Sequence, residues 1–184
     1  PSPDRIAPMC SHYGVCGGCK WQVLPYELQI KHKQNQVENV LRRIGKVELP
    51  EITPILGSKE TTYYRNKLEF TFSNKRWLTD DEVKAGVQYD DMNALGFHIP
   101  GAFDKVLDIQ ECALMQGLNN RLRNGIREFA IKESIPFYDL RSHKGVLRGM
   151  MLRISTTGEV MLLIQARVEC DNDKVLLEKV LQYV

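Results

Sequence analysis

Three of the five cysteines of this chain lie close together in the sequence, as Cys10, Cys16 and Cys19. The C-x5-C-x2-C spacing encloses three glycines, which let the backbone turn tightly enough for the three thiolates to face one point. The odd number of cysteines argues against a scaffold of disulfide bonds. We therefore predict that this loop binds a metal through its thiolates.

A fourth ligand is available in Cys112, at the end of the segment Asp108–Cys112, between an expected strand and an expected helix. Three clustered cysteines with one distant cysteine are more typical of a [4Fe-4S] cluster than of a structural zinc site, whose ligands usually come in pairs. Zinc remains an alternative, as do cysteines without any metal, and His12 could replace a sulfur around either metal. Cys170 lies between two acidic residues and is given no role.

No catalytic machinery is visible in the sequence. Neither a G-x-G-x-x-G nor a G-x-x-x-x-G-K-[ST] segment occurs, so no loop that would cradle a nucleotide or S-adenosylmethionine can be named. No nucleophile stands out either. The sequence therefore predicts no catalytic and no cofactor-binding residue in this chain.

The composition is that of a globular domain, with 184 residues of which 43% are hydrophobic, and it excludes disordered and collagen-like chains. No segment approaches the roughly 18 apolar residues of a membrane helix, and the N-terminus lacks a signal-peptide pattern. We expect a monomer in the cytoplasm that makes no contact with membranes. Because the chain begins at Pro1 and ends at Val184 within a helical pattern, we expect a piece of a longer protein.

The formal charge of +2 conceals a segregation of charges along the chain. Residues 1–50 carry 7 basic and 4 acidic groups, residues 77–112 carry 2 and 8, and residues 113–153 carry 8 and 3. Basic blocks of this kind can form a phosphate-binding surface, although a solvated charged face explains any single block equally well.

Two elements position the candidate groups most clearly. Helical spacing of apolar residues predicts a helix from Pro25 to Ile44, whose polar face carries Lys31, Lys33 and Arg42. Strict alternation then predicts a strand over residues 64–73. Its apolar residues Leu68, Phe70 and Phe72 would face the core, and Arg65 and Lys67 would share the opposite face.

The remaining pattern predicts an α+β fold, with a split βαβ-like antiparallel sheet, helices on one side and an N-terminal cysteine-rich cluster loop. Residues 1–24 would form the cluster loop, and residues 25–184 a central α+β RNA-binding domain from which Cys112 closes the cluster. The other expected elements are strands at 84–89, 94–99 and 105–109, a helix at 114–132, a hairpin of strands 147–155 and 160–168, and a final helix capped by Asp171.

Several motifs in this order resemble one family, the iron-sulfur-containing RNA uracil-5 methyltransferases of the RumA/TrmA type. The resemblance covers nearly the whole chain. It rests on Cys10-x5-Cys16-Gly17-Gly18-Cys19 with Trp21-Gln22, on Tyr64-Arg65-Asn66-Lys67-Leu68-Glu69-Phe70, on Asp108-x3-Cys112, and on the hairpin segments Gly145 to Arg153 and Gly158 to Leu162.

The resemblance implies a function for the full-length protein. Members of the family pass a methyl group from S-adenosylmethionine to C5 of a uridine, after an active-site cysteine has added to C6 of the base. That cysteine, the carboxylate that removes the C5 proton and the cofactor site would belong to a C-terminal methyltransferase domain that is missing here. This chain would be the central part, which holds the cluster and binds RNA, with ribosomal RNA preferred over transfer RNA.

The resemblance also places the arginine of the Tyr-Arg motif, Arg65, at the RNA. From the expected strand and helix faces, we predict that Lys67 lies beside it and that Lys31, Lys33 and Arg42 extend the footprint. A structural alternative is that Arg65 pairs with Glu69 or Glu111 and only holds the sheet. The alternative function is a zinc-stabilised RNA-binding module without a catalytic domain. An electron-transfer ferredoxin fits poorly, since such proteins are usually acidic and lack long basic helices.

Overall fold

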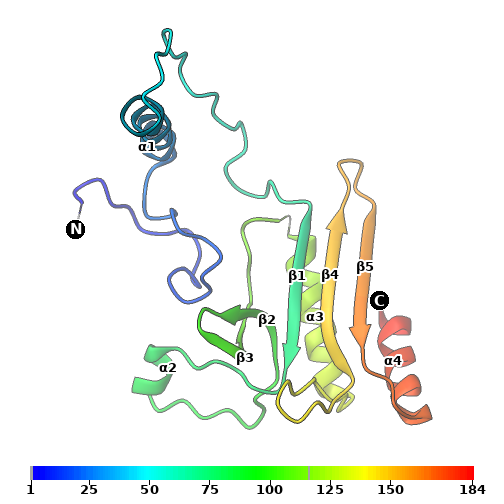
Figure 1. Ribbon diagram of the computed structural model, residues 1–184. Helices are drawn as coiled ribbons and strands as arrows, with labels where there is room; N and C mark the ends of the chain where they lie inside the picture. The colour runs from blue at the N-terminus through cyan, green and yellow to red at the C-terminus, as the bar shows by residue number, and fades with distance from the viewer. Residues whose placement is uncertain (1, 116) are drawn as a thin grey trace.

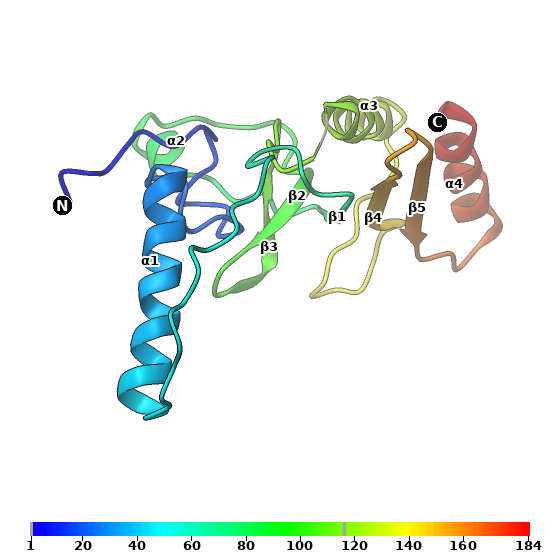
Figure 2. The same cartoon turned by 90° about the horizontal axis from the view of Figure 1, so that it is seen from above.

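The computed structural model describes residues 2–115 and 117–184, so Gln116, within the helix expected at 114–132, lies outside the described residues. Helices and strands follow the order expected for an α+β chain (Figures 1 and 2). The elements are α1 (Tyr26–Asn39), the π-helix η1 (Val40–Ile44), β1 (Lys67–Ser73), α2 (Asp80–Lys84), β2 (Ala94–Ile99), β3 (Ala102–Asp108), α3 (Leu118–Lys132), β4 (Leu147–Ile154), β5 (Val160–Ala166) and α4 (Asp171–Tyr183).

The five strands form one antiparallel sheet in the order β3-β2-β1-β4-β5. This confirms the predicted antiparallel α+β architecture. The connection through α3 differs from a split βαβ unit, because β3 and β4 run antiparallel and two strands separate them. The reason is local: β2 and β3 form a tight hairpin, so the chain leaves β3 at the sheet edge and α3 must cross both β2 and β1.

The core lies between the sheet and α3, and the alternation in β1 builds it as predicted. Leu68 and Phe70 are each 3% exposed and Phe72 is 1% exposed, whereas Lys67 and Glu69, which alternate with them, are exposed. Because side chains alternate along a strand, one face of β1 meets α3 and the other remains open. Figure 2 shows α3 across one face of the sheet and α4 beside β5. Stacked rings of Phe129 and Tyr183, 4.3 Å apart, join the two helices.

The first helix forms where expected but does not pack as its apolar spacing suggests. No residue of α1 is buried, and α1 stands away from the sheet, where it contacts the extended segment that follows it (Figures 1 and 2). The Tyr26 hydroxyl accepts a hydrogen bond from the Ser58 backbone N–H at 2.6 Å, and Gln34 accepts one from the Ile55 N–H at 2.8 Å. The apolar side chains of α1 therefore lie against one extended segment, which cannot bury them.

Two smaller expectations were wrong. The strand expected at 84–89 is absent from the described chain. The short helix α2 ends at Lys84, and it begins with a capping box in which the side chains of Thr79 and Glu82 accept hydrogen bonds from each other's backbone N–H. The sequence Thr-x-x-Glu carries this signal, which outweighs the weak strand propensity of the acidic segment. The last helix is capped by Cys170 and Asp173 rather than by Asp171, because the capping position lies one residue earlier.

Candidate functional site

The cysteine loop is held by its own backbone and by two side chains. Backbone N–H groups of Tyr13 and Cys16 donate to the carbonyls of Cys10 and His12, at 3.1 and 3.0 Å. The Cys10 N–H donates to Gln22 Oε1 at 3.1 Å, and the Tyr13 hydroxyl donates to the carbonyl of residue 20 at 2.7 Å. These bonds make residues 10–20 a defined loop even though they belong to no helix or strand.

Gly17 places this loop on the sheet. Its φ of +73° is in the left-handed region that favours glycine, and its α-carbon faces the ring of Pro100, in the turn between β2 and β3. A Cβ at this position would lie 2.5 Å from the Pro100 Cγ. The close approach is thus possible only for glycine, and it brings Cys16 and Cys19 against the end of β2.

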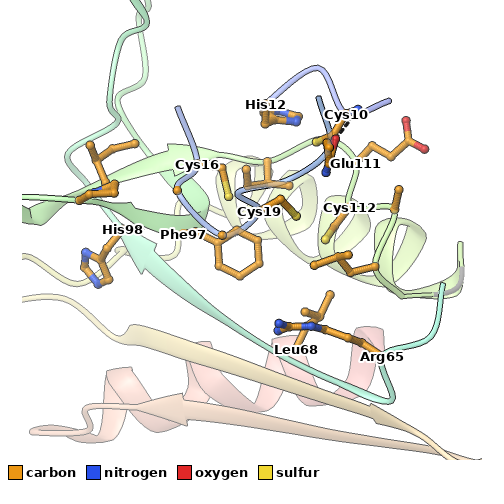
Figure 3. A pocket seen from close by; sticks show the side chains of 18 residues that line it. Cys10, His12, Cys16, Cys19, Arg65, Leu68, Phe97, His98, Glu111 and Cys112 are labelled. Atoms are coloured by element: carbon orange, nitrogen blue, oxygen red, sulfur yellow. Dashed lines mark hydrogen bonds between the residues drawn. The ribbon is translucent and has the colours of Figure 1, made fainter. Parts of the chain in front are cut away.

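The four cysteines that the sequence selected line one cavity of about 490 Å³ (Figure 3). Cys10, Cys16 and Cys19 enter it from the loop, and Cys112 enters from the segment between β3 and α3. Burial raises the pKa of the Cys16 thiol, and the other three cysteines raise it further, an effect that requires their sulfur atoms to be near. The structure therefore brings the four together, while their role as metal ligands stays a prediction.

The described side chains do not form a ready-made site for a metal ion. Within residues 2–115 and 117–184, no group of three or more His, Cys, Asp and Glu side chains is arranged to hold a single metal ion. His12 lies half-buried in the lining of the cavity, where its Nε2 accepts a 3.5 Å hydrogen bond from the Gln110 N–H.

Cys112 is fixed by α3. Its backbone N–H donates to Asn120 Oδ1 at 3.0 Å, and the fully buried Arg123 donates to the same oxygen at 3.2 Å and to the Ile109 carbonyl at 2.9 Å. Burial lowers the pKa of Arg123 to about 10, and Cys112 opposes this shift by raising it. Burial also raises the pKa of the Cys112 thiol, and the charge of Arg123 only partly opposes this rise.

A buried carboxylate ties the same segment to the sheet. Asp108, 3% exposed at the end of β3, accepts from Arg76 at 2.6 Å and from Arg127 of α3 at 2.7 Å. It also accepts from the backbone N–H of Leu95 in β2 at 3.0 Å. In the sequence, Asp108 stands out only as part of a motif. An aspartate at the end of an apolar strand indicates a buried, bonded carboxylate, but nothing in the sequence indicates its arginine partners.

Arg65 lies at the same cavity, but it precedes β1 and so lies outside the strand in which it was expected. Its backbone N–H donates to the carbonyl of Leu114, two residues after Cys112, at 2.7 Å. Its side chain is exposed and lines the cysteine cavity. Among the described residues it has no carboxylate partner, and Glu69 pairs instead with Lys67 at 2.6 Å. The purely structural explanation of Arg65 thus lacks the ion pair it requires.

The other predicted RNA contacts divide into two groups. Lys33 lines a second cavity that also includes Arg65. Lys31 on α1 and Arg42 on η1 are exposed and are not among the described residues that line this cavity. Lys67 lies on the open face of the sheet. Trp21 entered the sequence argument only as part of the cysteine motif, with no contact assigned to it, and its ring lies 5.7 Å from the Lys33 Nζ. Its place directly after the cysteine loop was the signal for a contact there.

Comparison with known proteins identifies the family of the chain. It is 58% identical over 183 residues to a protein of Bacteroides thetaiotaomicron named uncharacterized RNA methyltransferase, with 100% of this chain and 40% of the relative covered. A protein of Porphyromonas gingivalis with the same name is 52% identical over 173 residues, or 89% of this chain and 36% of the relative. The chain belongs to the RumA/TrmA-type RNA methyltransferase family. The resemblance seen in the sequence is thereby confirmed.

The chain spans about 40% of the length of the first of these relatives, so it corresponds to one segment of that protein. The same fold is found in the solved structure of the tRNA (uracil-54, C5)-methyltransferase of Pyrococcus abyssi in complex with S-adenosyl-L-homocysteine. The TM-score is 0.60 at 24% identity, over 95% of this chain and 35% of that chain. No protein-family model matches the chain. No described helix is long and apolar enough to cross a membrane.

Proposed function

We propose that this chain is the central part of a methyltransferase that forms 5-methyluridine in ribosomal or transfer RNA. The observation that carries the proposal is the 58% identity, over the whole chain, to a relative named as an RNA methyltransferase. The solved neighbour acts on uracil C5 of transfer RNA and holds S-adenosyl-L-homocysteine, which supports uridine as the target and S-adenosylmethionine as the donor. Transfer would move the methyl group from the sulfonium to C5 and release the C5 proton and S-adenosylhomocysteine.

Within that protein, residues 1–24 would form a cluster loop and residues 25–184 a central RNA-binding domain. The catalytic cysteine, the carboxylate base and the S-adenosylmethionine site would lie outside these 184 residues. The shared fold supports this division, because this chain matches only 35% of the neighbouring enzyme's length.

Cys10, Cys16, Cys19 and Cys112 would hold a [4Fe-4S] cluster. All four line one cavity of about 490 Å³, and three clustered cysteines with one distant cysteine are more typical of a cluster than of a structural zinc site. With four cysteine ligands no iron is open to a substrate, so the group would supply a cross-link and folding free energy. That cross-link would join the loop to the segment that carries Leu114, the backbone partner of Arg65.

The residues of this chain would then act on RNA by binding and orientation. Arg65 offers a planar, unpaired guanidinium at the rim of the cysteine cavity, which suits paired hydrogen bonds to a phosphate or base edge. Its backbone bond to Leu114 ties its position to Cys112. The loop, the Cys112 segment and the RNA contact would thus form one unit.

The test uses the anaerobically purified full-length protein with methyl-labelled S-adenosylmethionine and separate preparations of unmodified ribosomal and transfer RNA. The expected product is 5-methyluridine in one of the two, identified by mass spectrometry of digested nucleosides, and the 184-residue chain alone should transfer nothing. A label found on another base, or on neither RNA, would refute the proposal. Stoichiometric zinc without iron would favour the alternative, a zinc-stabilised RNA-binding module.

A further inference from the structure

A second cavity, of about 660 Å³, opens next to the cysteine cavity and shares Arg65 and Cys19 with it. Its walls come from the N-terminal residues 6–9, the end of the cysteine loop, the face of α1 near Lys33, the extended segment 58–65 and Leu114. We name it the aromatic groove. None of these residues belongs to the sheet, so the groove depends on how the cysteine loop, α1 and segment 58–65 lie together.

Two aromatic side chains on its walls present open ring surface. Trp21 is 37% exposed and Tyr64 is 55% exposed, although both line the groove. Their backbones are held: Gln29 Nε2 donates to the Trp21 carbonyl at 3.1 Å, and the residues on either side of Tyr64 each donate to the segment that follows Cys112, at 2.8 and 2.7 Å. Exposed aromatic rings on a fixed backbone are suited to stacking, because they lose little freedom when a partner binds.

The groove is also positively charged. Lys20, Lys33 and Arg65 line it, against the single carboxylate of Glu60. None of the three cations forms an ion pair with a described carboxylate. Lys33 Nζ lies 5.7 Å from the Trp21 ring centroid, so one cation and one stacking surface are within the reach of a single ligand. A ligand that matches both features must be flat and apolar on one side and anionic on the other.

We propose that the aromatic groove binds an unpaired nucleotide of the RNA, with its base stacked on Trp21 or Tyr64 and its phosphate near Lys33 and Arg65. The inference rests on the proposed function in so far as the partner is RNA. Single-stranded nucleic acid is bound in this way by other proteins, through aromatic platforms and a basic groove. A base inside an A-form duplex already stacks on its neighbours, so the groove selects single-stranded or splayed RNA.

The test compares two tryptophans in the full-length protein. Trp77 is the matched control, since it also lies near a lysine, with Lys105 Nζ 5.5 Å from its ring, but outside the described lining of the groove. Binding of a fluorescein-labelled oligouridylate and of a blunt RNA duplex of equal length is measured by anisotropy. Trp21→Leu should weaken oligouridylate binding about 5- to 150-fold and leave duplex binding unchanged, whereas Trp77→Leu should change neither. Trp21→Phe should restore most of the affinity, and melting curves verify folding.

Unchanged oligouridylate affinity in folded Trp21→Leu would overturn the inference, and if the wild type still binds RNA the proposed function survives. Equal losses for the duplex would overturn it as well, because stacking cannot explain them. Failure of the wild type to bind any RNA would remove the proposed function together with the inference. As a second measurement, photo-crosslinking of 4-thiouridine RNA to the wild type should label peptides that contain Trp21 or Tyr64. If the RNA labels only other peptides, the groove binds a protein segment instead. The same follows if Trp21→Leu lowers the melting temperature of the full-length protein but not that of the 184-residue chain.

Discussion

A methyl group added at Gly17 tests whether the contact with Pro100 fixes the cysteine loop. In Gly17→Ala the new Cβ would lie 2.5 Å from Pro100 Cγ and 3.0 Å from its Cδ, about 1 Å inside ordinary van der Waals contact. A proline ring in a tight hairpin turn cannot rotate away, so the loop itself must shift. Gly14→Ala is the matched control, since Gly14 also has a positive φ, of +89°, but a Cβ there would meet nothing within 4 Å.

The expected magnitudes differ by the packing contribution. Both alanines pay for a left-handed backbone, about 1 to 2 kcal/mol. Only Gly17→Ala adds overpacking, about 1 to 3 kcal/mol. Because whole domains are stable by about 5 to 15 kcal/mol, the chain relieves this strain by opening the loop and not by unfolding the sheet.

Two assays read the opening. Trypsin cleavage after the exposed Lys20, in the apoprotein, should be about 5- to 150-fold faster in Gly17→Ala than in Gly14→Ala, if cleavage follows the open population. Iron content and visible absorption after anaerobic purification should fall in the same order. Equal cleavage rates in the two variants would refute the reasoning, because the Pro100 contact would then contribute nothing to the position of the loop.

Further predictions concern the thiolates, the RNA contact and acid stability. Cys16→Ser should abolish iron binding and lower the melting temperature, whereas Cys170→Ser, at an exposed position outside the cavity, should retain the iron. In filter binding with the full-length protein, Arg65→Ala should weaken RNA binding by about 1 to 3 kcal/mol, and Lys67→Ala, whose lysine is paired in the sheet, should weaken it less; equal effects would contradict this. Burial would raise the pKa of Glu82, but hydrogen bonds from a tyrosine, the capping backbone and an arginine hold it at about 2. Its ionised form therefore stabilises the fold above the unfolded pKa near 4.5, and this stability is lost as the pH falls toward 2, so urea midpoints should drop more steeply there in the wild type than in Glu82→Gln.

Local patterns predicted which residues form β1 and the first helix, and which face of β1 is buried, but not how the helix packs. Alternation in β1 needs only one buried face, and Leu68, Phe70 and Phe72 have it. The apolar stripe of α1 obeys its pattern equally well, yet Val37 is 55% exposed, because no element of the described chain covers that stripe. Amphipathic spacing states what a helix could bury, and only the neighbouring elements decide whether it does.

Residue order alone indicated that Cys10, Cys16 and Cys19 lie together, and the ordered motifs, with Cys112 among them, indicated the RNA methyltransferase family. Cysteine spacing within the loop and strand alternation are properties of neighbouring residues, so they can be read without a structure. The tertiary structure decided the placement of Arg65 beside the cysteine cavity, the buried pairing of Asp108 with Arg76 and Arg127, and the groove that joins Trp21 to Tyr64. Each of these joins segments separated by many residues, and their meeting depends on the order of the strands and the path of α3, which no local pattern specifies.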